Sequence, residues 1–157
     1  MILVALGTQD KQFFRLVRII DNAINKGIIK DEVVVQLGST KYSSSNMKMY
    51  SYISGDKLQK FMDEADLIVC HGGVGIITDS LKKGKKVFAM PRLREFNEHR
   101  NNHQNQLVDK FNELGYIKKI TSYDDFVKEY KKLDKFKPKK PTFNNKKILD
   151  IISDFIG

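Results

Sequence analysis

The sequence predicts a doubly wound α/β domain built on a Rossmann-like parallel sheet, and three observations support this fold class. Short, uninterrupted apolar runs alternate with amphipathic segments along the chain. Gly7 and Pro91 close two of these runs, as expected where a strand leads into a turn. The 157 residues are 41% hydrophobic and 30% charged, which is enough to build one packed core.

Most of the predicted strands centre on a short run of apolar side chains. Residues 1–6 form a continuous apolar run, which is typical of a parallel strand buried on both faces. Residues 31–37 contain three consecutive valines, and residues 85–90 end directly before Pro91. The full set of predicted strands is 1–6, 31–37, 49–53, 65–70, 85–90 and 116–120.

The predicted helices show apolar residues at a spacing of three and four. Residues 11–26 illustrate the pattern, with Leu16, Val17 and Ile20 on one stripe. Gly115 follows another such segment and is a typical helix stop. Between the strands and helices, residues 41–48 are rich in serine and predict a loop. The full set of predicted helices is 11–26, 56–64, 74–83, 101–114, 123–133 and 144–156.

Positive charge is concentrated late in the chain. The formal net charge is +9, and residues 128–147 hold nine Lys against two acidic residues. Four interpretations stay open: nucleic acid, an anionic membrane surface, an acidic protein partner, or a merely solvated segment. The few aromatic residues show no stacking pattern, so we expect no nucleic acid. We place the main domain at residues 1–133 and treat residues 134–157 as a basic linker and a C-terminal helix that packs on the domain or on a partner.

Composition also predicts where the protein resides. No apolar run approaches the roughly 20 residues that span a bilayer. Residues 1–6 lack the basic start of a signal peptide and fit a first strand instead. Cys70 is the single cysteine, which excludes a disulfide within the chain. We therefore expect a cytoplasmic protein.

The strongest chemical signal is His-Gly-Gly-Val-Gly at residues 71–75, between a predicted strand and a predicted helix. Glycines allow a close approach of the backbone, and a helix start offers free N–H groups and a positive dipole end. This combination predicts an anion site, most naturally for a phosphate or diphosphate. The motif is neither a Walker loop nor the dinucleotide fingerprint. The plain alternative is a glycine-rich turn that binds nothing.

Further polar residues follow the other buried strands, where ligands of doubly wound folds bind. Gly7 and Thr8 follow the first strand and should lie beside the His71 loop. Residues 91–106 are densely polar and offer groups suited to sugar hydroxyls, although a solvated helix start has the same composition. These candidates are Glu98, His99, Asn102, His103 and Gln104.

Two other chemistries are weighed at this edge. His99 and His103 are four residues apart and could share a helix face in a metal site, but no further ligand has matching spacing, so we expect no metal. Cys70 and His71 are adjacent on a strand and point to opposite faces, which favours a buried cysteine over a nucleophile. Asp79 lies on the second turn of the predicted helix, where it is either solvated or near a ribose.

The motifs at 71–75, Gly84 to Pro91 and 102–104 together resemble the C-terminal, donor-binding domain of family 28 glycosyltransferases, which is half of the GT-B fold. The resemblance covers roughly residues 1–120. It is strongest to the small subunits of split glycosyltransferases: the eukaryotic subunit that makes dolichyl-diphosphate chitobiose, and the PssE-like subunit of bacterial capsule and exopolysaccharide synthesis, a β-1,4-galactosyltransferase. The segment from Pro91 to Gln104 looks more like the PssE-like group.

The resemblance implies a role for each candidate residue. UDP would be held by Gly7, Thr8, His71, Gly72, Gly73, Val74, Gly75 and Asp79. Asp79 stands where peptidoglycan-building relatives have a Glu on the uridine ribose, and its side chain is shorter. Donor-sugar hydroxyls would be bound by Glu98, His99, Asn102, His103 and Gln104. Glu98 and His99 are the local candidates for the general base of an inverting displacement, unless the base lies in the other half.

The resemblance also implies a function and partners. The chain would be the donor-binding, catalytic subunit of a UDP-sugar glycosyltransferase, without an obligatory metal or other cofactor. It would transfer galactose from UDP-galactose to a lipid-diphosphate-linked sugar at the inner face of the membrane. A membrane-anchored subunit would supply the acceptor half. The alternatives are an N-acetylglucosaminyltransferase subunit of the same fold and a non-catalytic nucleotide-sugar-binding module.

Overall fold

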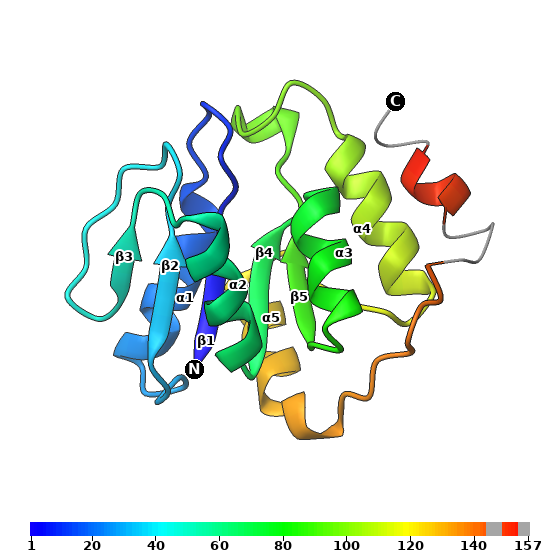
Figure 1. Cartoon of the computed structure of the whole chain (residues 1–157). Coiled ribbons are helices and arrows are strands. Elements are labelled where there is room, and N and C mark those ends of the chain that lie inside the picture. The colour runs from blue at the N-terminus through cyan, green and yellow to red at the C-terminus, as the bar shows by residue number, and fades with distance from the viewer. Residues whose placement is uncertain (144–148, 154–157) are drawn as a thin grey trace.

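The computed structural model describes residues 1–143 and 149–153, and these form a parallel six-stranded sheet with helices on both faces (Figure 1). The strand order is β3-β2-β1-β4-β5-β6. This is the Rossmann order, in which the chain starts at the centre and winds outward in both directions. The predicted fold class is confirmed. The strands are β1 (Ile2–Ala5), β2 (Val33–Gln36), β3 (Lys48–Tyr50), β4 (Leu67–His71), β5 (Val87–Met90) and β6 (Lys118–Lys119).

The central strands are apolar throughout because both of their faces are covered. Val4 of β1 lies opposite Val35 of β2 on one side and Val69 of β4 on the other. All four residues of β1, β2 and β5 are buried. Continuous burial explains why these strands read as unbroken apolar runs and not as an alternating pattern.

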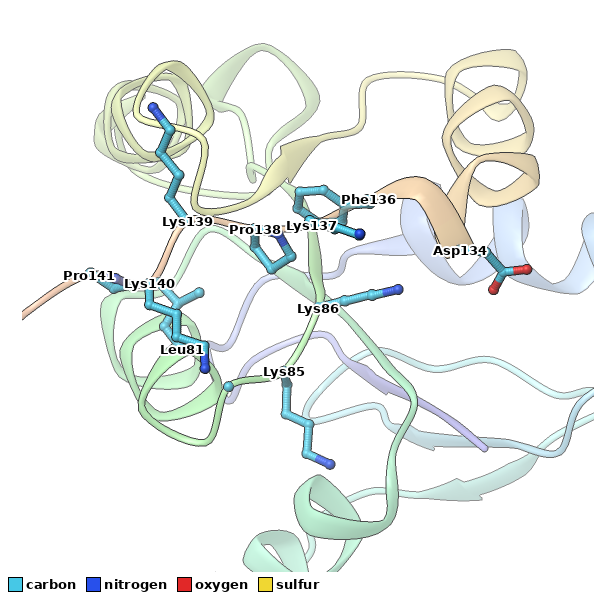
Figure 2. A pocket seen from close by; sticks show the side chains of 11 residues that line it. Leu81, Lys85, Lys86, Asp134, Phe136, Lys137, Pro138, Lys139, Lys140 and Pro141 are labelled. Carbon is cyan, nitrogen blue, oxygen red and sulfur yellow. The ribbon is translucent and has the colours of Figure 1, made fainter.

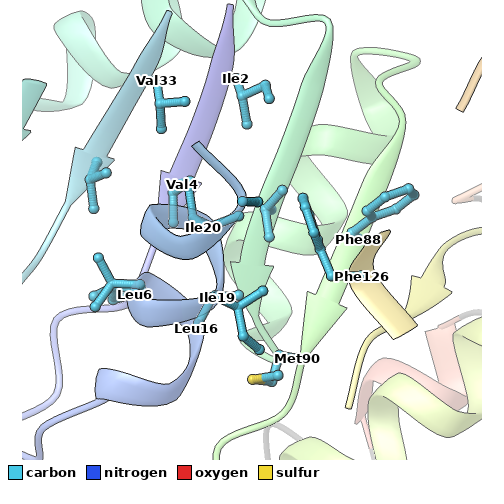
Figure 3. Packing of buried hydrophobic residues seen from close by; sticks show 14 of the residues in the cluster. Ile2, Val4, Leu6, Leu16, Ile19, Ile20, Val33, Phe88, Met90 and Phe126 are labelled. Atoms are coloured by element: carbon cyan, nitrogen blue, oxygen red, sulfur yellow. The ribbon is translucent and has the colours of Figure 1, made fainter. Parts of the chain in front are cut away.

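One face of the sheet is covered by α1 (Phe14–Asn25) and α5 (Tyr123–Lys131). Leu16 and Ile20 of α1 pack onto the strands, and Phe126 of α5 meets Phe88 edge-on with ring centroids 6.1 Å apart (Figure 3). Ser122 begins α5 by accepting a hydrogen bond from the backbone N–H of Asp125 at 3.1 Å.

The other face is covered by α2 (Gly55–Glu64), α3 (Val74–Lys82) and α4 (His103–Glu113), and short 3-10 turns lie at Arg94–Phe96 and Leu133–Lys135. Residues 149–153 are helical, and Ile151 packs into the same cluster of buried residues. The rest of the helix predicted at 144–156 lies outside the described residues. The division at residue 133/134 stays a prediction.

The structure refines two expectations. The predicted last strand shortens to β6, and Gly115, with φ +81°, ends α4 as expected. The serine-rich loop is fixed to α1, because Tyr42 and Ser44 donate to the carboxylate of Asp21 at 2.6 and 2.8 Å. Within the described part of the chain, no helix has the length and apolar character needed to cross a bilayer.

Candidate functional site

The loops that follow β1, β4 and β5 meet at the carboxyl edge of the sheet. Strand β1 lies between β2 and β4, so the chain leaves the sheet centre in opposite directions at this point. Such a switch point is where doubly wound folds bind ligands. A hollow of about 310 Å³ opens here and is lined by Gln9, His71, Gly72, Gly73, Val74, His99, Asn101, His103, Gln104 and Leu107.

Gln104, on the first turn of α4, ties the ends of β4 and β5 together. Its side-chain Oε1 accepts hydrogen bonds from the backbone N–H of Gly72 and of Arg92, each at 3.0 Å. Its Nε2 lies 3.1 Å from Nδ1 of His71. The side chain is buried and all of these bonds are internal. Gln104 therefore supports the wall of the hollow, and its amide is already bonded within the protein instead of being free for a ligand.

Arg92 fastens the end of β1 to the same cluster. Its guanidinium is fully buried, with Nε 3.2 Å from the carbonyl of Leu6 and Nη1 2.8 Å from that of Lys11. Nη1 also donates to the carbonyl of Glu98 at 3.0 Å, and the group lies over the ring of Phe13. Burial lowers the pKa of Arg92 to about 10, so the group stays cationic at neutral pH. These contacts hold a positive charge close enough to His71, which lines the hollow, to act on its ring.

Sequence reasoning missed Arg92. A basic residue directly after the Pro that closes a buried strand was the available signal. That signal is weak, because an exposed arginine in a loop has the same local sequence. The partners of Arg92 become visible only once the loops after β1 and β5 are brought together.

Glu98 lies away from the hollow. Its two oxygens pair with Nε and Nη2 of Arg15 at 2.8 and 2.7 Å, and Oε1 also accepts from the backbone N–H of Leu93 at 3.1 Å. The carboxylate is buried in this arrangement. Glu98 thus holds its loop against α1, and this geometry does not support the expectation that it contacts the sugar or acts as a base.

His71 fills a slot between two glycines. A Cβ on Gly7, which has φ +89°, would lie 2.8 Å from Nε2 of His71, and a Cβ on Gly73 would lie 2.3 Å from its Cε1. Burial lowers the pKa of His71 to about 3, and the charge of Arg92 acts in the same direction. His71 is therefore a neutral imidazole at physiological pH, so it can donate a hydrogen bond but does not carry a positive charge.

The start of α3 supplies backbone donors beside His71. Gly73 begins the helix without a side chain to bond the first N–H groups, and the first turn holds no acidic residue. The N–H groups of Val74 and Gly75 have no partner within the helix, because the first turn of any α-helix leaves them unpaired. The N–H of Gly72 is already bonded to Gln104, so the donors toward a ligand begin at Gly73.

The remaining candidates lie around this centre. His99 and His103 line the hollow, but His99 is in the loop before α4, so the two rings do not share a helix face. Asn102 bonds Arg94 and Glu95 and closes the 3-10 turn. Thr8 and Asp79 are exposed beside the hollow and do not line it.

Two other chemistries have little support in this region. Cys70 is fully buried, and burial raises the pKa of its thiol, as expected for a structural strand cysteine. Across residues 1–143 and 149–153, no three His, Cys, Asp or Glu side chains gather as metal ligands would.

A second hollow of about 330 Å³ lies at the amino end of β5 (Figure 2). Lys85 and Lys86 border it, together with a lysine-rich segment at 134–141 that we name the lysine strap. The ammonium groups of Lys85 and Lys86 donate hydrogen bonds to the backbone carbonyls of Asp63, Ala65 and Leu133. From the sequence, the only signal at this end of the sheet was the positive charge of residues 128–147, which left a macromolecular partner and a merely solvated segment both open.

The sheet order and the hollow at its switch point define the class of this protein: a Rossmann-like α/β domain. The chain belongs to the glycosyltransferase family 28 C-terminal domain, whose family model matches residues 1–155. The match extends past residue 120, where the resemblance seen in the sequence ended.

The chain is similar to curated relatives named UDP-N-acetylglucosamine transferase subunit ALG13. It is 33% identical over 75 residues to the protein from Saccharomyces cerevisiae, covering 47% of this chain and 35% of that one. It is 28% identical over 98 residues to the protein from Debaryomyces hansenii, covering 62% and 43%. The chain thus spans less than half the length of these relatives.

Solved structures match almost the whole chain. The solution structure of ALG13 has a TM-score of 0.59 at 19% identity, covering 99% of this chain and 96% of that one. Acinetobacter baumannii MurG has a TM-score of 0.57 at 14% identity, covering 98% of this chain and 44% of that one. At these identities the likeness shows the shared fold alone.

Proposed function

We propose that this chain is the donor-binding subunit of a split UDP-sugar glycosyltransferase. The observation that carries the proposal is the start of α3 at a hollow beside the switch point, where unpaired backbone N–H groups adjoin His71 and the buried charge of Arg92 acts on the same ring. This arrangement suits a diphosphate, which needs several donors and a positive field. Membership in family 28 supports the same ligand class.

In this proposal the diphosphate lies above Gly73, Val74 and Gly75, with His71 as a neutral side-chain donor. The same N–H groups and the helix dipole stabilise the charge that develops when UDP leaves. His99 and His103 line the hollow, and we assign them to the donor sugar. Thr8 and Asp79 are assigned to the edges, toward the acceptor and the ribose.

UDP-N-acetylglucosamine is the donor that we now propose. The resemblance seen in the sequence favoured galactose and capsule synthesis, but the curated relatives are named as UDP-N-acetylglucosamine transferase subunits. These names support the alternative over the first expectation. UDP-galactose is the competing outcome that a titration decides.

A partner subunit is the second part of the proposal. The relatives are named as subunits, and the chain matches 44% of MurG. We propose that a membrane-anchored partner supplies the acceptor half and presents a lipid-linked acceptor at the carboxyl edge of the sheet. The general base is then expected from that partner or from His99, since Glu98 is paired with Arg15.

Calorimetric titration with UDP-N-acetylglucosamine tests the diphosphate site through Val74→Pro, with Val74→Ala as its matched control. Proline removes the N–H of residue 74 and is tolerated at the first helical position. Gly73 has φ −78° and ψ 134°, the conformation that the residue before a proline prefers. The alanine variant loses the same valine contacts but keeps the N–H.

We expect Val74→Pro to weaken binding about 10- to 100-fold, the value of one hydrogen bond to a charged group, while Val74→Ala binds as the native chain does. Equal affinity in both variants would show that the N–H of residue 74 does not bind the diphosphate, which would contradict the proposed site. The same titration with UDP-galactose decides the donor. Sugar transfer on addition of the partner would separate an enzyme subunit from a non-catalytic binding module.

A further inference from the structure

The hydrogen bonds around Gln104 determine which nitrogen of His71 carries the proton. Backbone N–H groups are donors only, so the side-chain atom that faces Gly72 and Arg92 must be the amide oxygen of Gln104. The amide nitrogen therefore faces His71, where it donates to Nδ1 at 3.1 Å. A ring nitrogen that accepts a hydrogen bond is unprotonated. The neutral ring consequently carries its proton on Nε2.

The other ring nitrogen, Nε2, belongs to a side chain that lines the hollow. No group of the described chain bonds Nε2, and no buried side-chain nitrogen or oxygen of those residues lacks a partner, so Nε2 must be reachable from outside. His71 lines the hollow beside Gly73 and Val74. A free N–H thus stands next to the backbone donors that begin α3.

Two glycines of the motif, together with Gly7, leave the space that this arrangement needs. A Cβ on Gly72 would lie 2.8 Å from Cβ of Gln104, and Cβ atoms on Gly7 and Gly73 would collide with the ring of His71. A Cβ on Gly75, in contrast, would meet nothing within 4 Å. Gly7, Gly72 and Gly73 therefore make room for the side chains of His71 and Gln104, and a side chain at any of the three would displace one of them.

We propose that Gln104 is a positioning residue that holds His71 in the Nε2-protonated form and aims that N–H at an anionic oxygen of the bound ligand. This inference rests on the proposed function for the identity of the ligand, a nucleoside diphosphate ester. It assigns Gln104 a role through His71 and not through the hydroxyls of the sugar. Because His71 is neutral, recognition is by hydrogen bonding and does not depend on its titration.

Gln104→Glu tests the proposal, because it replaces the amide donor by an acceptor of the same shape. Two acceptors cannot face each other, so the proton of His71 must move to Nδ1, and the carboxylate raises the pKa of the ring. Gln106→Glu is the matched control, since it places the same charge on an exposed position of α4. Long-range proton–nitrogen spectra of the unliganded chain report the protonated ring nitrogen of His71 directly.

We expect the native chain and Gln106→Glu to show an unprotonated Nδ1, and Gln104→Glu to show a protonated one. Affinity for UDP-N-acetylglucosamine, whose own charge is constant over this range, should be flat from pH 6 to 8 in the first two. In Gln104→Glu it should fall about tenfold as the pH rises, when Nε2 loses its proton. Arg92 and His99 also face His71, but Arg92 stays charged and burial lowers the pKa of His99.

A protonated Nδ1 in the native chain would overturn the proposal, even if Gln104→Glu fails to fold. An unchanged ring in a folded Gln104→Glu would overturn it as well, as would a pH-independent affinity in that variant. The expected spectra without any binding of the ligand by the native chain would instead contradict the proposed function and leave the hydrogen-bond arrangement standing.

Discussion

The carboxyl edge of the sheet and the lysine strap both carry positive charge, but they carry it differently. At the carboxyl edge one arginine is fully buried, and its guanidinium donates to the backbone carbonyls of Leu6, Lys11 and Glu98. In the strap, Lys137 and Lys140 are exposed and form no ion pair within the described residues. Both regions enclose hollows of similar volume, about 310 and 330 Å³. Volume and charge therefore do not distinguish the two regions. The carboxyl edge differs because its hydrogen-bond donors are held in fixed positions.

The difference matters because a binding site gains affinity from groups that are fixed in advance. Gln104 and Arg92 immobilise the ends of β1, β4 and β5 before any ligand arrives. A lysine on a flexible stem loses conformational freedom each time it binds. We therefore place the nucleotide at the carboxyl edge and assign no ligand to the strap.

The largest expected effect is on stability and comes from Arg92→Met, which removes the side chain that holds the carboxyl edge of the sheet together. The change leaves the buried carbonyls of Leu6, Lys11 and Glu98 without their donor. We expect the free energy of unfolding to fall by about 3–5 kcal/mol in a urea titration. Arg100→Met removes the same charge from an exposed position and should change stability by no more than about 0.5 kcal/mol. Equal losses in both variants would deny Arg92 its structural role.

Gly73→Ala is the next largest change and acts on one contact. Its Cβ would approach Cε1 of His71 to 2.3 Å, so the ring must leave its slot. We expect a loss of about 1–3 kcal/mol in stability together with weaker binding of UDP. Gly75→Ala, whose Cβ meets nothing, should gain up to about 1 kcal/mol from helix propensity. A stable Gly73→Ala variant that binds UDP normally would contradict the claim that the ring of His71 needs the space beside Gly73.

Acid should loosen the carboxyl edge through His71. The folded pKa is about 3, below the ordinary value of 6.5, so the unfolded chain binds the proton more tightly. This contribution to stability is complete above pH 6.5 and is lost as the pH falls toward 3. The slope is at most about 1.4 kcal/mol per pH unit. Denaturation between pH 5 and 7 should show a shallower slope for His71→Asn than for the native chain.

Neutralising the strap should have the smallest effect. Lys137→Gln combined with Lys140→Gln removes two exposed charges that form no ion pair in the described chain. We expect a change in unfolding free energy within about 0.5 kcal/mol and unchanged affinity for UDP-N-acetylglucosamine. A clear loss of affinity would move the ligand, or part of it, toward the strap.

The fold could be predicted from the sequence because its signals are local. The apolar run at residues 1–6 marks β1 without knowledge of any other segment, and the spacing of Leu16 and Ile20 marks α1. The motif at 71–75 can also be recognised from its own residues, since a glycine-rich turn before a helix is a local feature. These parts of the molecule needed no information about contacts in space.

The roles of Gln104, Glu98 and Arg92 could not be predicted in the same way. Each depends on a partner that lies far away in the sequence: Arg92 bonds Leu6, and Glu98 pairs with Arg15. From sequence, all three are polar residues beside a candidate site and look equally available to a ligand. Only the structure shows which of them are already bonded within the protein.

The most direct test of the central claim is to titrate the isotope-labelled chain with UDP-N-acetylglucosamine and follow the backbone amides by NMR. We expect the largest shifts on Gly73, Val74 and Gly75 and on the ring of His71, while residues of the lysine strap stay unchanged. Shifts centred on residues 134–141, with those of α3 unaffected, would contradict it.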